Sequence, residues 1–253
     1  MKGQEQKPSA MRDQHIKLYF EQEHAAIVSR LEGYGLSDIQ VYRSDHWYLG
    51  DDAEGTVRRY YAARYQASRC FVKLAWNDST IQNEIYVNDY LTQHQITFIP
   101  QTLLFDYDYA PAASLLVTEF LPQLRPFAIP SSVPAFEAVC ASFEEMCCQL
   151  TALGAMHCDI SPSNLLFDRH GAMILTDFGI GHAPGSEHFL IDYRVHDGTY
   201  YRTQGNVRIY DDVFSFLQML DDCKLPESFR GLACYRQLEK QLGRHELRIT
   251  LSE

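Results

Sequence analysis

The sequence lacks long apolar runs. No stretch approaches the ~20 consecutive apolar residues that a helix needs to cross a bilayer, and the polar first ten residues contain no apolar core of the kind found in secretory signals. We therefore expect a cytoplasmic protein without a membrane partner. At 253 residues, with 46% hydrophobic and 22% charged side chains, the chain can bury the core of one large domain or of two lobes.

Positive charge is also scarce. The 22 Lys and Arg residues are outnumbered by 33 Asp and Glu residues, which leaves a net charge of −11. Nucleic-acid binding depends on cationic contacts to phosphate, so this balance argues against a nucleic-acid partner. It does not argue against a small anionic ligand, because a few local donors can hold one.

Paired cysteines are missing as well. The seven cysteines are odd in number and include no C-x-x-C pair, and most lie in apolar segments. Buried reduced thiols are therefore favoured over a disulfide framework or a metal site. The cysteines are Cys70, Cys140, Cys147, Cys148, Cys158, Cys223 and Cys234.

Two short polar motifs flank an apolar hairpin in the second half of the chain. Residues 157–164 contain Asp159 and Asn164, and residues 177–179 begin with Asp177. The apolar runs between them predict two short strands joined by a turn. Phosphoryl transfer from a nucleotide needs such a set: one carboxylate near the attacking hydroxyl, and an amide and a second carboxylate that hold Mg²⁺ against the phosphates.

These motifs resemble those of the protein-kinase-like superfamily. HCDISPSN stands where protein kinases carry H-R-D-x-x-x-x-N, and residues 177–179 match their D-F-G. The resemblance covers roughly residues 40–222. It implies an α+β, bilobal protein-kinase-like fold with a small antiparallel-sheet N-lobe and a truncated, mainly helical C-lobe. The implied divisions are an N-terminal tail and helix (1–39), an N-lobe (40–121), and a hinge with the C-lobe (122–253).

The resemblance also implies ATP and Mg²⁺ as cofactors and gives the motif residues roles. Asp159 would orient the acceptor hydroxyl and accept its proton, and Asn164 and Asp177 would bind the metal. Asn164 thus belongs to both the catalytic and the metal-binding set. His157 is expected to support the loop rather than to act as a base.

Upstream of the motifs the sequence predicts one helix and several antiparallel strands. Apolar residues at spacings of three, four and seven indicate a helix over residues 16–31. That helix either packs on the back of the domain or docks a partner. Residues 40–76 are rich in aromatic and β-branched side chains and predict three strands, and residues 95–122 predict two more.

The first turn of this region resembles the kinase glycine-rich loop. Gly50, Gly55 and Val57 match G-x-G-x-x-G-x-V, whereas Asp52 stands where the middle glycine is expected. Glycine allows backbone N–H groups to approach phosphates. An aspartate there predicts a weaker grip on the nucleotide.

Lys73 lies in an apolar strand, at the position of the kinase lysine that holds the α- and β-phosphates. A buried ammonium group needs an anionic partner. The next predicted helix, residues 78–93, supplies Glu84, which resembles the kinase glutamate that pairs with this lysine. Asp89, on another face of that helix, is the alternative.

Phe71 departs from the small residue that protein kinases prefer two positions before the lysine, and it is similar to the aromatic residue of many aminoglycoside-phosphotransferase-like kinases. Phe71 either stacks on the adenine or fills its pocket. Thr118 falls at the gatekeeper position, and Glu119 and Leu121 lie in the segment that resembles the hinge. With Leu166 of the predicted hairpin, these residues complete the expected nucleotide contacts.

The last part of the chain resembles a shortened kinase C-lobe. A buried helix is predicted over residues 135–155, and residues 182–197 resemble an activation segment that ends in G-T-Y-Y-R-T-Q-G without the usual A-P-E. Asp212 resembles the buried kinase aspartate that bonds the catalytic-loop backbone. Cys158 replaces the arginine that clamps a loop phosphate, which predicts activity that does not depend on phosphorylation of that loop.

Three functions remain open on this sequence. A minimal Ser/Thr protein kinase is favoured by D-F-G and by G-T-Y-Y, whereas a small-molecule kinase is favoured by Phe71 and by Ser161, which stands where Ser/Thr kinases carry a lysine. A pseudokinase scaffold is suggested by Asp52 and Phe71. The expected partners are a protein substrate, or a small-molecule one, and a regulatory protein. The compact size is similar to kinases that some bacteria deliver into host cells, so bacterial or host cytosol is expected.

Overall fold

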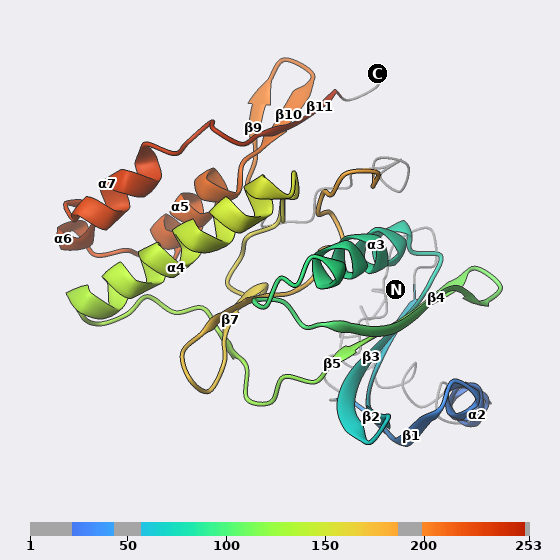
Figure 1. The fold of residues 1–253 in the computed structure, drawn as a ribbon. Coiled ribbons are helices and arrows are strands. Elements are labelled where there is room, and N and C mark those ends of the chain that lie inside the picture. The colour runs from blue at the N-terminus through green and yellow to red at the C-terminus, as the bar shows by residue number, and fades with distance from the viewer. Residues whose placement is uncertain (1–21, 43–56, 187–198, 251–253) are drawn as a thin grey trace, which may run out of the picture. The chain divides into compact units, whose positions relative to one another are not determined.

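The computed structural model describes residues 22–42, 57–186 and 199–250 (Figure 1). The chain divides into two compact units. The first comprises residues 1–78 and 102–120, and the second comprises residues 79–101 and 121–253. Residues 79–93, the helix predicted after Lys73, are therefore grouped with the second unit and not with the sheet that precedes them.

The first unit is built on a five-stranded antiparallel sheet. Its order is β1-β2-β3-β5-β4, so β2, β3 and β5 are interior strands. Every residue of β5 except the last is buried, as expected for a strand covered on both faces. The strands are β1 (Leu36–Val41), β2 (Val57–Tyr65), β3 (Ser68–Trp76), β4 (Thr102–Ala110) and β5 (Ala113–Glu119).

The turn between β2 and β3 is a tight hairpin, as predicted. Gln66 and Ala67 both have positive φ, 48° and 68°, which matches the twist of a two-residue hairpin even though neither residue is a glycine. The predicted N-terminal helix is observed from residue 24 as α2 (His24–Gly33), and its Ile27 and Leu31 are buried in the core of this unit. The start of that prediction lies outside the described residues.

The second unit is mainly helical. Its core is formed by apolar faces of the helices, with the rings of Phe143 and Phe216 stacked at 3.9 Å between centroids. The helices are α3 (Ser79–Gln93), α4 (Val133–Ala152), α5 (Asp212–Asp222), α6 (Glu227–Arg230) and α7 (Ala233–Glu239). None of the described helices is long and apolar enough to span a bilayer.

Two small sheets complete this unit. One has the order β6-β7-β8 and contains the predicted hairpin, and the other has the order β11-β10-β9. The strands are β6 (Arg125–Pro126), β7 (Leu165–Phe167), β8 (Met173–Leu175), β9 (Arg202–Gln204), β10 (Val207–Tyr210) and β11 (Leu247–Thr250). The second small sheet was not predicted, because β11 comes from the far end of the chain.

Helix α4 differs from its prediction at both ends. It begins at Val133, with Pro134 in the first turn, where a missing N–H costs no hydrogen bond. It ends at Ala152, and Gly154 has a positive φ of 66° that turns the chain away from the helix. Residues 153–155 therefore form the connection to His157 and not a last helical turn.

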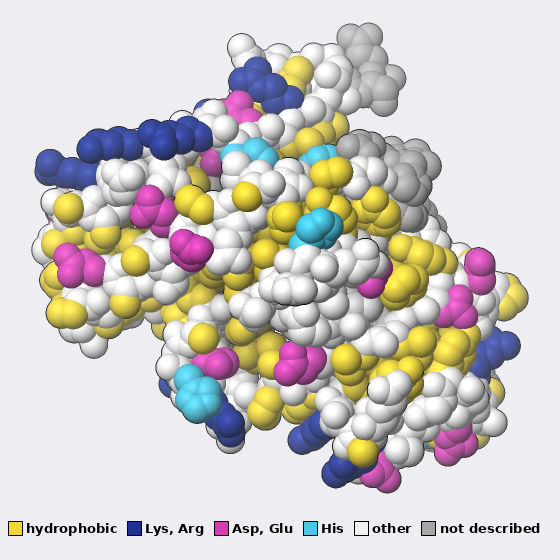
Figure 2. All heavy atoms as spheres, in the orientation of Figure 1, with side chains coloured by type: hydrophobic (Ala, Val, Ile, Leu, Met, Phe, Trp, Pro, Cys, Tyr) yellow, Lys and Arg dark blue, Asp and Glu magenta, His cyan; other side chains and the backbone are white. Residues whose placement is uncertain are grey.

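Cations gather on the surface over α7, where Figure 2 shows a row of Lys and Arg side chains. Arg236 of α7 and, after the helix, Lys240 and Arg244 are exposed and spaced four residues apart. Among the described residues, no ion pair neutralises these three. This segment therefore keeps local positive charge in a chain whose net charge is −11.

Candidate active site

The loop that follows α4 is held in place by His157. Its ring is fully buried and packs against Phe178, with 4.4 Å between ring centroids. Nε2 lies 2.9 Å from the carbonyl oxygen of Thr176 and donates to it, while Nδ1 accepts a hydrogen bond from the backbone N–H of Asp159 at 3.2 Å. Both ring nitrogens are thus used in support of the loop, in agreement with the structural role expected for His157.

The backbone of the same loop is bonded to α5. The carboxylate of Asp212 accepts hydrogen bonds from the N–H groups of His157 and Cys158, each at 2.8 Å, as the resemblance implied. Burial raises the pKa of Asp212 above its usual value, and the two N–H groups oppose that shift. Cys158 is buried and has a φ of 65°, a strained conformation that these bonds help to maintain.

Asp159 and Asn164 are brought together by this loop. Nδ2 of Asn164 donates to the Asp159 carboxylate at 2.9 Å and to its carbonyl oxygen at 3.0 Å. The other carboxylate oxygen of Asp159 accepts a hydrogen bond from the hydroxyl of Thr199 at 2.9 Å. The sequence motif contained Thr199, but nothing in the sequence predicted that its hydroxyl reaches Asp159.

Asp177 follows β8, the second strand of the predicted hairpin. The N–H of Thr176 donates to the carbonyl oxygen of Asn164 at 3.0 Å, so the two expected metal ligands lie at the ends of neighbouring segments. Asp177 is exposed and has a φ of 66°, whereas Phe178 after it is completely buried. The buried ring thus anchors an exposed carboxylate.

The expected metal ligands suit Mg²⁺ chemically. Asn164 uses its Nδ2 toward Asp159, which leaves its Oδ1 with only a 3.3 Å hydrogen bond from Ser163. An amide oxygen and a carboxylate are hard oxygen ligands, and Mg²⁺ is commonly held by one or two such groups together with phosphates and water. No cluster of three or more His, Cys, Asp or Glu side chains occurs in the described ranges, so an all-protein metal cage is not found there.

Three of the expected nucleotide-contacting residues, Phe71, Lys73 and Thr118, lie on the interior strands β3 and β5 of the first unit. Phe71 is opposite Thr118 across the β3–β5 ladder, and its ring is bracketed by Tyr42 and Tyr60, at centroid distances of 5.1 and 5.7 Å. Lys73 places its Nζ 5.9 Å from the centre of the Tyr60 ring. An aromatic cluster therefore surrounds the side chain that was expected to meet the adenine.

The other predicted residues are distributed over both units. Val57 begins β2 opposite Trp76. Glu119 ends β5 and is exposed. Leu166 of β7 pairs with Ile174 of β8. Glu84, only 5% exposed in α3, and Leu121 belong to the second unit. The pairing of Glu84 with Lys73 stays a prediction, and so does the grouping of all these residues around a nucleotide. Gly50, Asp52, Gly55 and most of the predicted activation segment lie outside the described residues.

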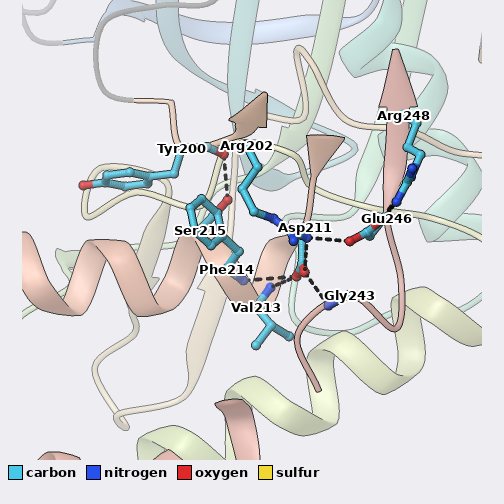
Figure 3. Close-up of polar contacts among 9 residues, drawn as sticks. All are labelled: Tyr200, Arg202, Asp211, Val213, Phe214, Ser215, Gly243, Glu246 and Arg248. Carbon is cyan, nitrogen blue, oxygen red and sulfur yellow. Dashed lines mark hydrogen bonds and ion pairs between the residues drawn. The ribbon is translucent and has the colours of Figure 1, made fainter. Parts of the chain in front are cut away.

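The segment that carries Thr199 is tied to α5 by a polar network (Figure 3). Ser215 donates to the carbonyl oxygen of Tyr200 at 3.0 Å, and Arg202 contacts Asp211 at 3.3 Å and Glu246 at 2.5 Å. Glu246 in turn pairs with Arg248 at 2.8 Å. These contacts join residues near the site to the end of the chain.

Asp211 is the centre of that network. One carboxylate oxygen caps α5 by accepting from the N–H groups of Val213 and Phe214, both at 3.0 Å. The other accepts from the N–H of Gly243 at 2.8 Å (Figure 3). Asp211 and Asp212 thus bond different parts of the chain. Asp211 holds the C-terminal segment, and Asp212 holds the loop with Asp159.

Comparison with known proteins gives little further identification. No family model matches the chain, and no curated protein matches its sequence. Among solved structures, the chain is similar to the kinase PK-1 of Cydia pomonella granulovirus, with 13% identity and a TM-score of 0.43 over 64% of this chain. The chain spans 57% of the length of that kinase.

Proposed function

We propose that this protein is an ATP- and Mg²⁺-dependent phosphotransferase with a bilobal, kinase-like fold, and that it transfers the γ-phosphate to a serine or threonine hydroxyl of a protein. The observation that carries the proposal is the pair of bonds on the carboxylate of Asp159, one from Asn164 and one from Thr199. A carboxylate held on both sides is preorganised toward one acceptor position.

The chain's own residues would divide the chemistry as follows. Asp159 orients the acceptor hydroxyl and takes its proton, and Asn164 and Asp177 offer an oxygen each to the metal. Bound Mg²⁺ would neutralise charge on the phosphates. Lys73 is proposed to hold the α- and β-phosphates and Glu84 to hold Lys73.

A protein acceptor is favoured by Thr199. The segment G-T-Y-Y is typical of protein kinases and uncommon in small-molecule kinases, and here it contacts the proposed base directly. The small-molecule alternative is supported by Ser161, whose hydroxyl lies 2.9 Å from that of Ser163 where a Ser/Thr kinase carries a lysine. The two serines offer hydroxyl groups but no positive charge.

The experiment that tests this proposal supplies the purified protein with labelled ATP and Mg²⁺. Label is followed into the protein itself, into a generic protein acceptor and into a panel of small hydroxyl compounds, with Asp159→Asn as the inactive control. Transfer to serine or threonine of the protein acceptor is expected. Transfer to small hydroxyl compounds alone would select the small-molecule kinase, and nucleotide binding without transfer would select the scaffold.

A further inference from the structure

One face of α3 covers the segment that follows Asp177. Thr80, Asn83 and Tyr86, three residues apart, all lie on this face. Asn83 is completely buried, and its Nδ2 lies 2.8 Å from the carbonyl oxygen of Gly181, 3.1 Å from that of Gly179 and 3.3 Å from that of Phe178. One carboxamide thus bonds three carbonyl oxygens within the four residues that follow Asp177, the proposed metal ligand.

The orientation of this carboxamide follows from its surroundings. The NH₂ group has two hydrogens to share among three carbonyl oxygens, whereas a flipped group would place Oδ1 against all three. In the observed orientation, Oδ1 is buried with no hydrogen-bond partner among the described residues. An unsatisfied buried acceptor costs stability. The hydrogen bonds that Nδ2 donates to carbonyl oxygens of residues 178–181 offset that cost, and they explain why an asparagine stands at this position.

Close backbone approach extends the contact along α3. A Cβ atom added to Gly179 would lie 3.3 Å from the side chain of Thr80, and one added to Gly185 would lie 2.5 Å from the hydroxyl of Tyr86. Tyr86 also donates to the carbonyl oxygen of Pro184 at 2.8 Å. Glycine at 179 and 185 therefore lets the segment lie directly on the helix. The contacts of Thr80, Asn83 and Tyr86 together oppose movement of the segment along α3.

We propose that Asn83 is a positioning residue for the phosphotransfer proposed above, on which this inference rests. It holds α3 and the Asp177 segment as one piece, so that the metal ligand Asp177 and the neighbouring Glu84 keep a constant spacing. Phe178 follows Asp177 directly, so fixing its carbonyl group limits the directions open to the Asp177 carboxylate. The segment that follows Asp177 can then be released from α3 only when the hydrogen bonds of Asn83 break.

The test uses two variants and one matched control. Asn83→Leu keeps the number and branching of the side-chain heavy atoms and removes both donors, and Asn83→Ser is too short to reach the carbonyl oxygens. Tyr90→Phe removes another hydrogen bond from α3, that of the Tyr90 hydroxyl to the carbonyl oxygen of Leu153 at 3.0 Å, far along the helix from Asn83. All three are made in the full chain.

The first measurement needs no nucleotide. Amide hydrogen exchange of residues 177–186 is expected to be at least tenfold faster in both Asn83 variants and unchanged in Tyr90→Phe. The second is calorimetric titration of ATP at a series of Mg²⁺ concentrations. The Mg²⁺ concentration for half-maximal binding is expected to rise at least tenfold in the Asn83 variants, with the affinity for metal-free ATP within twofold of the unchanged protein.

The outcomes separate this inference from the proposed function. Exchange or Mg²⁺ dependence equal to that of the unchanged protein in both Asn83 variants would overturn the positioning role. Equal losses of metal-free and metal-bound affinity would also overturn it, because they indicate general destabilisation. If the unchanged protein binds no nucleotide, the proposed function fails. Slow exchange that depends on Asn83 would still support the contact between Asn83 and the segment that follows Asp177.

Discussion

Each carboxylate oxygen of Asp212 accepts a hydrogen bond from one of the two residues that precede Asp159, namely from the N–H groups of His157 and Cys158. The geometry of the proposed base therefore depends on a buried acid that lies 53 residues later in the chain. The bonds also satisfy two backbone donors that burial has removed from water.

Asp212→Asn is expected to lower the free energy of unfolding by about 1–3 kcal/mol, because an amide can accept from one N–H but leaves the other buried and unpaired. The initial rate of transfer should fall as well, since the Asp159 loop loses a support. Urea denaturation and rate measurements check this, with exposed Asp108→Asn as the control. A loss no larger than that of the control would contradict the role of Asp212.

Asp177→Asn should reduce phosphoryl transfer by orders of magnitude while leaving thermal unfolding nearly unchanged. The carboxylate is exposed, so its replacement removes metal affinity and little packing. The measurement is the initial rate at saturating ATP across a range of Mg²⁺ concentrations, alongside circular dichroism melting. Turnover equal to that of the unchanged protein would mean that the metal site is assigned wrongly.

Phe71→Ala is expected to weaken ATP binding several-fold. Offset stacking on a base adds on the order of 1 kcal/mol beyond simple burial, and the Tyr42 and Tyr60 rings hold Phe71 in one place. Titration calorimetry compares this variant with Phe105→Ala, which removes a partly exposed ring of β4. Tighter binding by the Phe71 variant would show that the ring fills the pocket instead.

The Glu246 network should give the protein an acid-sensitive contribution to stability. Hydrogen bonds from Arg248, and then from Arg202, hold the pKa of Glu246 below its usual 4.5. A depressed carboxyl pKa stabilises the folded state above the unfolded pKa, and this contribution is lost as the pH falls through the folded pKa. The folded protein should therefore lose this advantage progressively as the pH falls below 4.5.

Comparison with Glu246→Gln isolates that contribution. The difference in free energy of unfolding between the two proteins is expected to be largest at pH 7 and to shrink steadily as the pH falls below 4.5. Exposed Glu239→Gln should show no such difference at any of these pH values. A pH-independent difference for Glu246→Gln would indicate that shape, and not charge, is what the network needs.

Phosphatase treatment should leave the initial rate unchanged. Cys158 is buried and uncharged, so the usual clamp for a loop phosphate is missing. Of the arginines that could replace it, Arg194 lies outside the described residues, Arg202 is paired with Asp211 and Glu246, and Arg208 lies over the Tyr201 ring. Mass spectrometry confirms that residues 180–205 are unmodified. A tenfold fall that rephosphorylation restores would contradict the prediction.

Much of the local structure could be predicted from the sequence. The hairpin of β7 and β8 and the hairpin of β2 and β3 follow from short strand-like runs with turn residues between them, and helix α3 was expected from its resemblance to a kinase segment. The candidate site residues Asp159, Asn164 and Asp177 were proposed from their spacing and from the resemblance of their motifs to those of protein kinases. Such patterns involve residues only a few positions apart, so they can be recognised in a single sequence.

The long-range contacts were decided only by the tertiary structure. Thr199 meets Asp159 across 40 residues, and Asn83 reaches carbonyl groups 95 to 98 residues away. No role was predicted for Asp211, yet its carboxylate joins Arg202 and Gly243. No periodicity encodes such pairs, because they form only when the apolar helix faces pack into one core and bring distant backbone donors and acceptors together out of water.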